Sequence, residues 1–536
     1  MLYRLAMLTR LAPLASVASL ALLAGCNPHP IKEVAVGSVS TPEIPVPLEV
    51  DKKVDVLVVI DNSGSMGEEQ ANLAANFGPF IETLESAGAD YRIGITTTDL
   101  GGPHCEGASS GGDLQLSSCL ERPEDFVYAG TDLFDQACAA SCALDSAALQ
   151  VEPTAADSSG ELAPRPWIES YAGNSNLGEG VDTLEAFQCF APQGIGGCGW
   201  ESPLEATSRA LENMQDPSRP EHGFLRDDAL LAVLIITDEV DCSSNPLHED
   251  ALFEAETFWG EGASYATSAV CWNAGVACSG DSPYEDCWDQ GFDALGQPTT
   301  DPTQMMLHPV SSYVAQLEQI AADKLAGREV TVSVIAGVPQ GYSSGEAEQV
   351  FADSPDPEFQ RLFGIAPGCT NEVDGVEQTA LPPVRLLSFA SAFASAGLAE
   401  GTRNVYSVCD ADYAPALFDI VSGIEVELPP ACFPGCALDL EPDTDALEYS
   451  CEVFERGAGG DRNVDACVLG AAGWELPEGA DLCWYAKTGD ELADACVETN
   501  SNLEFELIRR AGVSFPGDTN FLALCEQSAH PSVDCG

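Results

Sequence analysis

Residues 54–66 read VDVLVVIDNSGSM, and this stretch decides the fold that the sequence predicts. Its first seven residues are nearly all apolar, and a short polar loop follows them directly. Continuous rather than alternating apolarity is typical of a strand that is covered on both faces, as in parallel sheets. Leu230–Ile236 shows the same pattern, and Tyr91–Thr97 and Val330–Ile335 are weaker versions of it. These four runs therefore predict strands of one parallel sheet.

Between the predicted strands, apolar residues recur at the spacing of a helix. Residues 73–84 and 310–321 carry them three and four positions apart, and residues 384–396 and 413–424 are further candidates. Strands that alternate with helices are the signature of an α/β fold with a parallel sheet.

The charge balance of the chain excludes several classes of partner. The 536 residues include 86 Asp and Glu but 21 Lys and Arg, which gives a formal net charge of −65. General nucleic-acid binding is excluded because it needs basic residues that neutralise phosphates, and docking on anionic lipid head groups is disfavoured. The hydrophobic fraction of 45 % is ordinary for a globular protein and argues against wholesale disorder.

The first 25 residues are predicted to be an export signal. Two arginines are followed by an apolar segment, residues 11–24, that is short for a transmembrane helix. The segment ends in Leu-Ala-Gly-Cys, which resembles the bacterial lipobox and implies cleavage before Cys26 and acylation of Cys26. A plain signal peptide is the alternative. By analogy with Gram-negative sorting, Asn27 favours an outer-membrane lipoprotein of the cell envelope, periplasmic or surface-exposed, with lipid as its only membrane anchor.

Composition divides the rest of the chain into three parts. Residues 26–50 are rich in proline and valine and predict an extended tether, or else a first strand packed on the next domain. Residues 51–427 hold the predicted α/β domain, and residues 428–536 a small cysteine-rich domain. Three interruptions of the α/β pattern predict insertions, near residues 100–198, 241–304 and 338–382.

The cysteines predict an exported protein stapled by disulfides. The chain has 21 cysteines, and twenty remain if Cys26 is acylated. Such a number is too large for a reducing cytosol unless the cysteines hold metals, and an even number fits ten disulfide bonds. The segments 100–198 and 241–304 carry six and four cysteines. With Cys369 and Cys409 these make twelve in residues 51–427, and residues 431–536 carry eight.

Oxygen-bearing side chains follow two of the predicted strands. Asp61, Ser63 and Ser65 come directly after the first strand, and Asp238 follows the run at Leu230–Ile236. In a parallel sheet both strands deliver such residues to the same edge, where α/β proteins place their ligands. A carboxylate and two hydroxyls are the donors that a hard divalent cation prefers. A helix-capping turn without metal is the alternative.

The stretch VDVLVVIDNSGSM, together with the later VLIITDE, resembles the von Willebrand factor A (VWA) domain and its metal-ion-dependent adhesion site (MIDAS). The resemblance implies a doubly wound, mostly parallel sheet over residues 51–427 and a Mg²⁺, Ca²⁺ or Mn²⁺ ion held by Asp61, Ser63, Ser65 and Asp238. The family also supplies a threonine from a middle loop. No threonine stands in the matching stretch here, where Ser202 aligns and Glu201 is a plausible substitute.

These features lead to the expectation of a non-enzymatic, lipid-anchored envelope protein. It would bind a protein or matrix partner through the cation, with a partner carboxylate taking an open coordination position. The insertions start after predicted strands and are expected to wall the metal site, or else to be stabilising decoration. The alternatives in function are a metal-independent envelope scaffold and, less favoured, a metal-dependent hydrolase.

Overall fold

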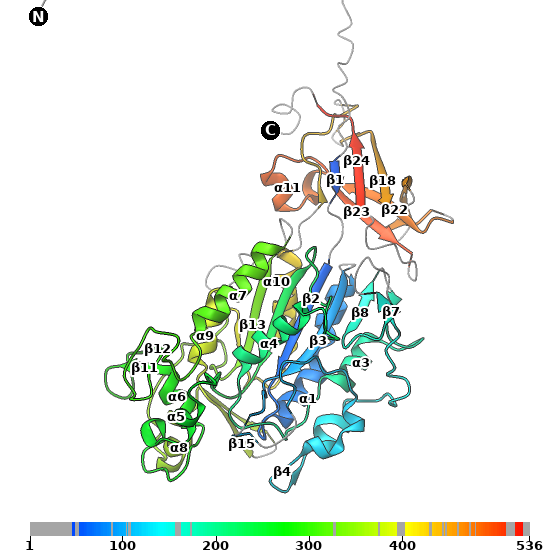
Figure 1. Cartoon of the computed structure of the whole chain (residues 1–536). Helices are drawn as coiled ribbons and strands as arrows, with labels where there is room; N and C mark the ends of the chain where they lie inside the picture. Colours follow the sequence, from blue (N-terminus) through cyan, green and yellow to red (C-terminus); the bar gives the residue numbers. More distant parts are fainter. Residues whose placement is uncertain are drawn as a thin grey trace, which may run out of the picture.

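The computed structural model describes most of the chain after residue 45. The described residues are 46–48, 53–86, 89–102, 104–105, 109–155, 162–171, 174–324, 329–373, 376–393, 402–427, 431–441, 444, 447–457, 460–470, 473–477, 479–510 and 520–528. Two seven-stranded sheets dominate this part of the chain, and five two-stranded sheets accompany them (Figure 1). The predicted signal peptide and Cys26 lie outside the described residues.

The first large sheet, called the central sheet here, has the strand order β16-β13-β10-β2-β3-β8-β9. Five neighbouring strands run parallel, namely β2 (Lys53–Ile60), β3 (Asp90–Thr97), β10 (Leu230–Ile236), β13 (Val330–Ala336) and β16 (Val405–Ser407). Beyond β3, the strands β8 (Ile168–Tyr171) and β9 (Asn174–Ser175) continue the sheet in antiparallel directions. All four apolar runs of the sequence thus form parallel strands of this sheet.

The continuous apolarity of β2 follows from burial on both faces. Val54, Val56, Val58 and Ile60 point into one hydrophobic cluster, and the alternate residues Leu57 and Val59 point into another. Helices cover each face. The first cluster is completed by α1 (Gly67–Asn76), α2 (Gly78–Ser86), α3 (Thr183–Phe190) and α10 (Ala414–Glu427). The second is completed by α4 (Pro203–Gln215), α7 (Val310–Asp323) and α9 (Val384–Ser391).

The second large sheet gathers strands from both ends of the described chain. Its order is β1-β24-β18-β19-β22-β23-β17, and Figure 1 shows the blue strand β1 beside the red strand β24. Its strands are β1 (Val46–Leu48), β17 (Ala431–Cys432), β18 (Cys451–Gly457), β19 (Gly460–Ala466), β22 (Leu482–Lys487), β23 (Glu504–Arg509) and β24 (Asn520–Cys525). The segment predicted as a tether therefore contributes one strand, and the remainder of that prediction is untested.

The remaining elements are short and lie mostly in the predicted insertions. The two-stranded sheets are β4 (Val127–Tyr128) with β5 (Thr131–Asp132), β6 (Thr154–Ala155) with β7 (Leu162–Ala163), β11 (Val276–Ser279) with β12 (Asp286–Asp289), β14 (Cys369–Val373) with β15 (Val376–Ala380), and β20 (Val468–Leu469) with β21 (Trp474–Glu475). The short helices are η1 (Cys119–Glu121), η2 (Pro123–Phe126), η3 (Asp135–Ala139), α5 (Glu249–Phe253), η4 (Glu256–Phe258), α6 (Ala269–Gly275), α8 (Pro357–Phe363), η5 (Gly489–Glu491) and α11 (Asp494–Glu498).

The prediction of a doubly wound, mostly parallel sheet as the fold class is wrong. Of the seventeen strand pairings in the described residues, five are parallel and twelve antiparallel, so the fold is mixed α/β with two large sheets. The physical reason is that only some strands leave a clear pattern in the sequence. Strands buried on both faces give continuous apolar runs, whereas antiparallel strands and short hairpins with a solvated face do not.

The prediction of disulfide bonds is confirmed for nine pairs. They are Cys105–Cys198, Cys119–Cys138, Cys142–Cys189, Cys242–Cys271, Cys278–Cys287, Cys369–Cys409, Cys432–Cys496, Cys451–Cys525 and Cys467–Cys483. Each of these bonds joins cysteines of the same predicted domain, residues 51–427 or residues 428–536. Disulfides in this number indicate an oxidising compartment. Among the described helices, none has the length and apolarity that a membrane crossing requires.

Candidate metal centre

Asp61 lies at the carboxyl edge of the central sheet, directly after β2. Its backbone N–H donates to the carbonyl of Ile236 at the end of β10, at 2.9 Å, so the two strand ends meet at this residue. The side chain is fully buried. Its Oδ1 accepts the backbone N–H of Ser63 at 2.8 Å, and its Oδ2 accepts the hydroxyl of Thr237 at 2.5 Å. These bonds orient the carboxylate and leave further lone pairs on both oxygens.

The two serines of the loop lie together on its open side. Ser63 Oγ and Ser65 Oγ are 3.2 Å apart, and Ser63 is buried whereas Ser65 is exposed. Gln70, in α1, clamps the base of this loop. Its amide donates to the carbonyls of Asp61 and Gly194, both at 2.8 Å, and its Oε1 accepts the N–H of Gln193 at 2.8 Å. The clamp joins the loop after β2 to the turn that follows α3.

Asp238 is separated from the end of β10 by Thr237 and lies at the same edge of the sheet. Its side chain is buried, and its Oδ1 has no hydrogen-bond partner. Burial is the main cause that raises the pKa of Asp238 well above the usual value, and the charge of Asp61 adds to it. The hydroxyl of Ser65 opposes this shift and only reduces it. An unpartnered buried carboxylate oxygen is costly, so this position favours a bound proton or a cation.

The two candidates from the middle loop point to different partners. Glu201 is buried, accepts the hydroxyl of Thr98, and keeps one oxygen, Oε1, without a partner. Burial and then the charge of Asp61 raise the pKa of Glu201 well above the usual value. Ser202 directs its hydroxyl to the carbonyl of Cys242 at 2.9 Å. The structure therefore places the Glu201 carboxylate in the field of Asp61 and engages the Ser202 hydroxyl with the backbone.

Several residues of this region escaped the sequence analysis. Thr98 directly follows β3. The run of threonines before Asp99, at the end of a buried strand, was the signal in the sequence that could have marked it. Burial raises the pKa of Glu69, in the first turn of α1, to about 7. Burial, followed by the charge of Asp61, also raises the pKa of Glu239, to about 8. No pattern in the sequence marks Glu69 as buried.

Six carboxyl groups at this edge share raised pKa values, with burial as the main cause. They are Asp61 (pKa about 6), Glu69, Asp99, Glu201, Asp238 and Glu239. In the described part of the chain, none of the six forms an ion pair with lysine or arginine. Buried like charges without a counter-ion disfavour ionisation, and a divalent cation would relieve this cost.

The donor set fits a hard cation that binds one carboxylate and hydroxyls. Among the described residues, one group of three titratable side chains has a ligand atom of each within 4.8 Å of the other two. It consists of His104, Asp250 and Glu254, and it lies away from Asp61. Asp61, Glu201 and Asp238 do not form such a triad. A cation at this edge would therefore use Asp61 with the Ser63 and Ser65 hydroxyls, rather than a cage of carboxylates.

The first insertion contacts this loop directly. A methyl group added at Gly64 would lie 2.5 Å from Cδ1 of Tyr128, so the tyrosine ring of the β4–β5 hairpin packs on the loop between the two serines. Tyr128 is 50 % exposed, which leaves half of its surface free beside Ser65. The first insertion therefore packs on this loop, and its role in walling a metal site stays a prediction.

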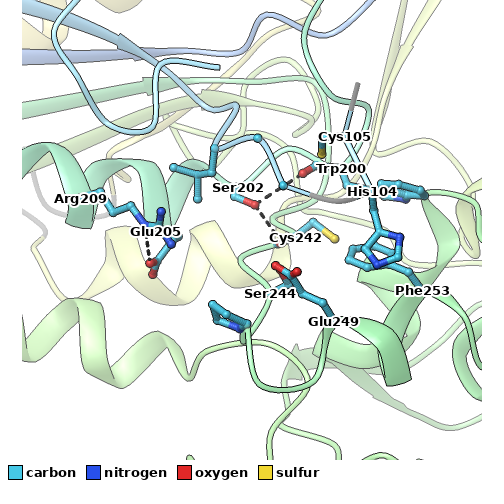
Figure 2. Close-up of a pocket in the computed structure, with 14 residues that line it drawn as sticks. His104, Cys105, Trp200, Ser202, Glu205, Arg209, Cys242, Ser244, Glu249 and Phe253 are labelled. Atoms are coloured by element: carbon cyan, nitrogen blue, oxygen red, sulfur yellow. Dashed lines mark hydrogen bonds and ion pairs between the residues drawn. The ribbon is translucent and has the colours of Figure 1, made fainter. Parts of the chain in front are cut away.

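A hollow lies beside Ser202, which is one of its lining residues (Figure 2). It has a volume of about 210 Å³, and His104, Trp200, Glu205, Arg209 and Phe253 are among its lining residues. Figure 2 shows Ser202 directed at Cys242 and the rings of His104 and Phe253 side by side on one wall. This hollow lies between the two insertions rather than over the acidic cluster.

Comparisons with known proteins add no family. No family model matches the chain, and no curated protein matches it. Among solved structures, the open conformation of the pilus adhesin SpaC from Lactobacillus rhamnosus GG covers 89 % of this chain with 10 % identity and a TM-score of 0.26. The pilus adhesin RrgA from Streptococcus pneumoniae covers 92 % with 12 % identity and a TM-score of 0.26. The chain spans 39 % and 58 % of those structures, and such low scores carry no argument about fold or function.

Proposed function

We propose that this chain is a binding protein of the bacterial cell envelope, with an adhesin-like role. It would take up a divalent cation, Mg²⁺, Ca²⁺ or Mn²⁺, at the carboxyl edge of the central sheet and bind an acidic group of a protein or matrix partner there. Asp61, Ser63 and Ser65 would hold the cation, with Asp238 behind them and Glu201 or Ser202 joining. The resemblance of this loop to the VWA adhesion motif supports the proposal.

One observation carries the proposal. Buried carboxylates with raised pKa values surround the loop, and Asp238 Oδ1 and Glu201 Oε1 have no hydrogen-bond partner. Structural carboxylates usually have partners, so a cation held beside these groups by Asp61, Ser63 and Ser65 would relieve the cost of burying their charges. The cation would supply a positive charge that attracts a partner carboxylate despite the net charge of −65.

The chain's own residues prepare the site for this role. Thr237 and the Ser63 N–H hold the Asp61 carboxylate in one orientation, so little freedom is lost on binding. Exposed Ser65 marks the open side of the loop. Tyr128 offers half of its surface beside it and would contact the partner directly, which gives the first insertion a role in selection.

The envelope location rests on the disulfide bonds and on the lipobox-like segment. Lipid attachment at Cys26 is part of this proposal, because that residue lies outside the described ones. We also propose a binding role rather than a catalytic one, since the loop would hold a cation beside the half-exposed ring of Tyr128, which suits contact with a partner.

The test is cation-dependent binding by the purified chain, produced in an oxidising compartment. The probe is a set of peptides that present one Glu or, in the matched set, one Gln. Wild-type protein should bind Glu peptides in Mg²⁺ or Ca²⁺, lose them in EDTA, and not bind the Gln set. Asp61→Ala should abolish binding while Asp228→Ala, at the opposite end of the sheet beside Lys53, should retain it. Equal binding by Asp61→Ala would reject the proposal.

A metal-independent scaffold is a second candidate, favoured by one observation. Both oxygens of Asp61 already accept hydrogen bonds, from Ser63 and Thr237, as a purely structural loop residue would. In that case the insertions alone would bind the partner. Insensitivity of partner binding to EDTA distinguishes this candidate from the first.

A further inference from the structure

We infer that His104, Asp250 and Glu254 form a second metal site, which takes a transition-metal dication of the Zn²⁺ class and joins the first insertion to the second. His104 belongs to the segment 100–198, and the two acids belong to the segment 241–304. The inference does not depend on the proposed function, because it uses none of the residues at the edge of the central sheet.

The spacing of the three side chains suits a bound ion. One ligand atom from each of His104, Asp250 and Glu254 lies within 4.8 Å of the other two. Ligand atoms about 2.1 Å from a zinc ion lie roughly 3.4 Å from one another in tetrahedral geometry. The two carboxylates are exposed, so small rotations about their side-chain bonds bring them to this distance.

The backbone holds the three residues in place. Asp250 is in α5 and Glu254 follows its last residue, and the Glu254 N–H donates to the Asp250 carbonyl at 3.0 Å. Residues four apart on a helical turn present their side chains on one face. His104 adjoins Cys105, whose disulfide bond to Cys198 fixes this part of the first insertion. The site is therefore built from two stapled segments.

The imidazole of His104 lacks the partner that a ring nitrogen needs. Its Nε2 is buried and has no hydrogen-bond partner. The ring packs on Phe253, with centroids 4.9 Å apart, and Phe253 packs in turn on Trp200 at 4.5 Å. Stacking limits rotation of the imidazole, so the ring is held ready next to the two acids. A metal ion would take one ring nitrogen of His104 as a ligand and neutralise the repulsion between the carboxylates.

The donor types distinguish this site from the one at the sheet edge. An imidazole with two carboxylates suits Zn²⁺, Mn²⁺, Ni²⁺ or Cu²⁺, whereas hydroxyls with a carboxylate suit Mg²⁺ and Ca²⁺. A metal here would cross-link the insertions at the rim of the hollow in Figure 2, which His104 and Phe253 line. Binding would therefore make that rim more rigid.

The experiment is a Zn²⁺ titration, by calorimetry, of the purified chain carrying no histidine tag. Two variants are compared in an Asp61→Ala background, which removes the candidate ligand at the sheet edge. His104→Gln should weaken Zn²⁺ binding at least about tenfold, as even outer-shell changes at metal sites do. His222→Gln, which removes an imidazole elsewhere, should bind Zn²⁺ like its parent.

Two further measurements decide the outcome. Co²⁺ should give visible absorption bands with the parent protein that are lost in His104→Gln and in the double variant Asp250→Asn/Glu254→Gln. Far-ultraviolet circular dichroism checks that each variant is folded. Equal Zn²⁺ affinity and equal Co²⁺ spectra in folded His104→Gln and its parent would overturn the inference. Mg²⁺ binding by protein with an intact Asp61 tests the proposed function separately.

Discussion

At high pH and without metal, the Asp61→Asn protein should be more stable than wild type. In saturating cation it should be less stable than wild type. Burial raises the pKa of Asp61 from 3.8 to about 6. One pKa unit corresponds to about 1.4 kcal/mol, so the ionised group costs the folded protein on the order of 3 kcal/mol at pH 8. Asn keeps an acceptor for the Ser63 N–H, and the Thr237 hydroxyl can turn to accept from the new amide.

The sign of the pH dependence follows from linkage. The folded-state pKa of Asp61 lies above its unfolded-state value, so its contribution to stability is complete below about pH 4 and is lost as pH rises through about 6. In EDTA the wild type and Asp61→Asn should therefore be similar at pH 4 and should differ by up to about 3 kcal/mol at pH 8. A cation in 1,000-fold excess over its dissociation constant adds about 4.1 kcal/mol to wild type alone, which reverses the order.

The assay is urea unfolding under non-reducing conditions, followed by tryptophan fluorescence, since Trp167 is fully buried. It is run in EDTA and in Mg²⁺, at both pH values. The control is Asp228→Asn. Burial raises the pKa of Asp228, but the hydrogen bond and charge of Lys53 outweigh this and lower it, so the control should destabilise at pH 8. If Asp61→Asn lowered the free energy of unfolding by more than about 1 kcal/mol in EDTA at pH 8, the reasoning would be refuted, because Asp61 would then act as a structural hydrogen-bond acceptor.

Three further predictions concern packing around the site. Gly64→Ala should cost about 1 kcal/mol of unfolding free energy in wild type and less in a Tyr128→Ala background, because the added methyl meets the tyrosine ring; equal costs would contradict this contact. Gln70→Leu should cost about 3 kcal/mol or more in urea unfolding, since it leaves two carbonyls and two N–H groups unpaired, and Gln70→Glu, which keeps the acceptor, should cost less. Arg385→Met should cost about 3–5 kcal/mol because it strands the buried Asp241 carboxylate, and adding Asp241→Asn should restore part of that loss; no restoration would argue against an ion-pair role.

The sequence alone was sufficient to predict the strands that are buried on both faces. β2 shows why, since its alternate residues enter two hydrophobic clusters and every position must be apolar or paired. Asp61, Ser63, Ser65 and Asp238 could be placed at one sheet edge because each follows such a strand. The mixed fold could not be predicted in the same way. β1 pairs with β24 across nearly the whole chain, and no local pattern records that pairing.

What the sequence by itself determined is the set of buried strands and the oxygen donors at their ends, because burial on two faces leaves a continuous apolar signature in the chain. Only the tertiary structure decided the surroundings of those donors. It brought Glu69 and Glu201 into the field of Asp61, laid Tyr128 over Gly64, and set His104 beside two acids of another insertion. Burial, electrostatic coupling and ligand spacing arise between residues far apart in sequence, so they depend on how loops and helices pack and not on the order of residues along any one segment.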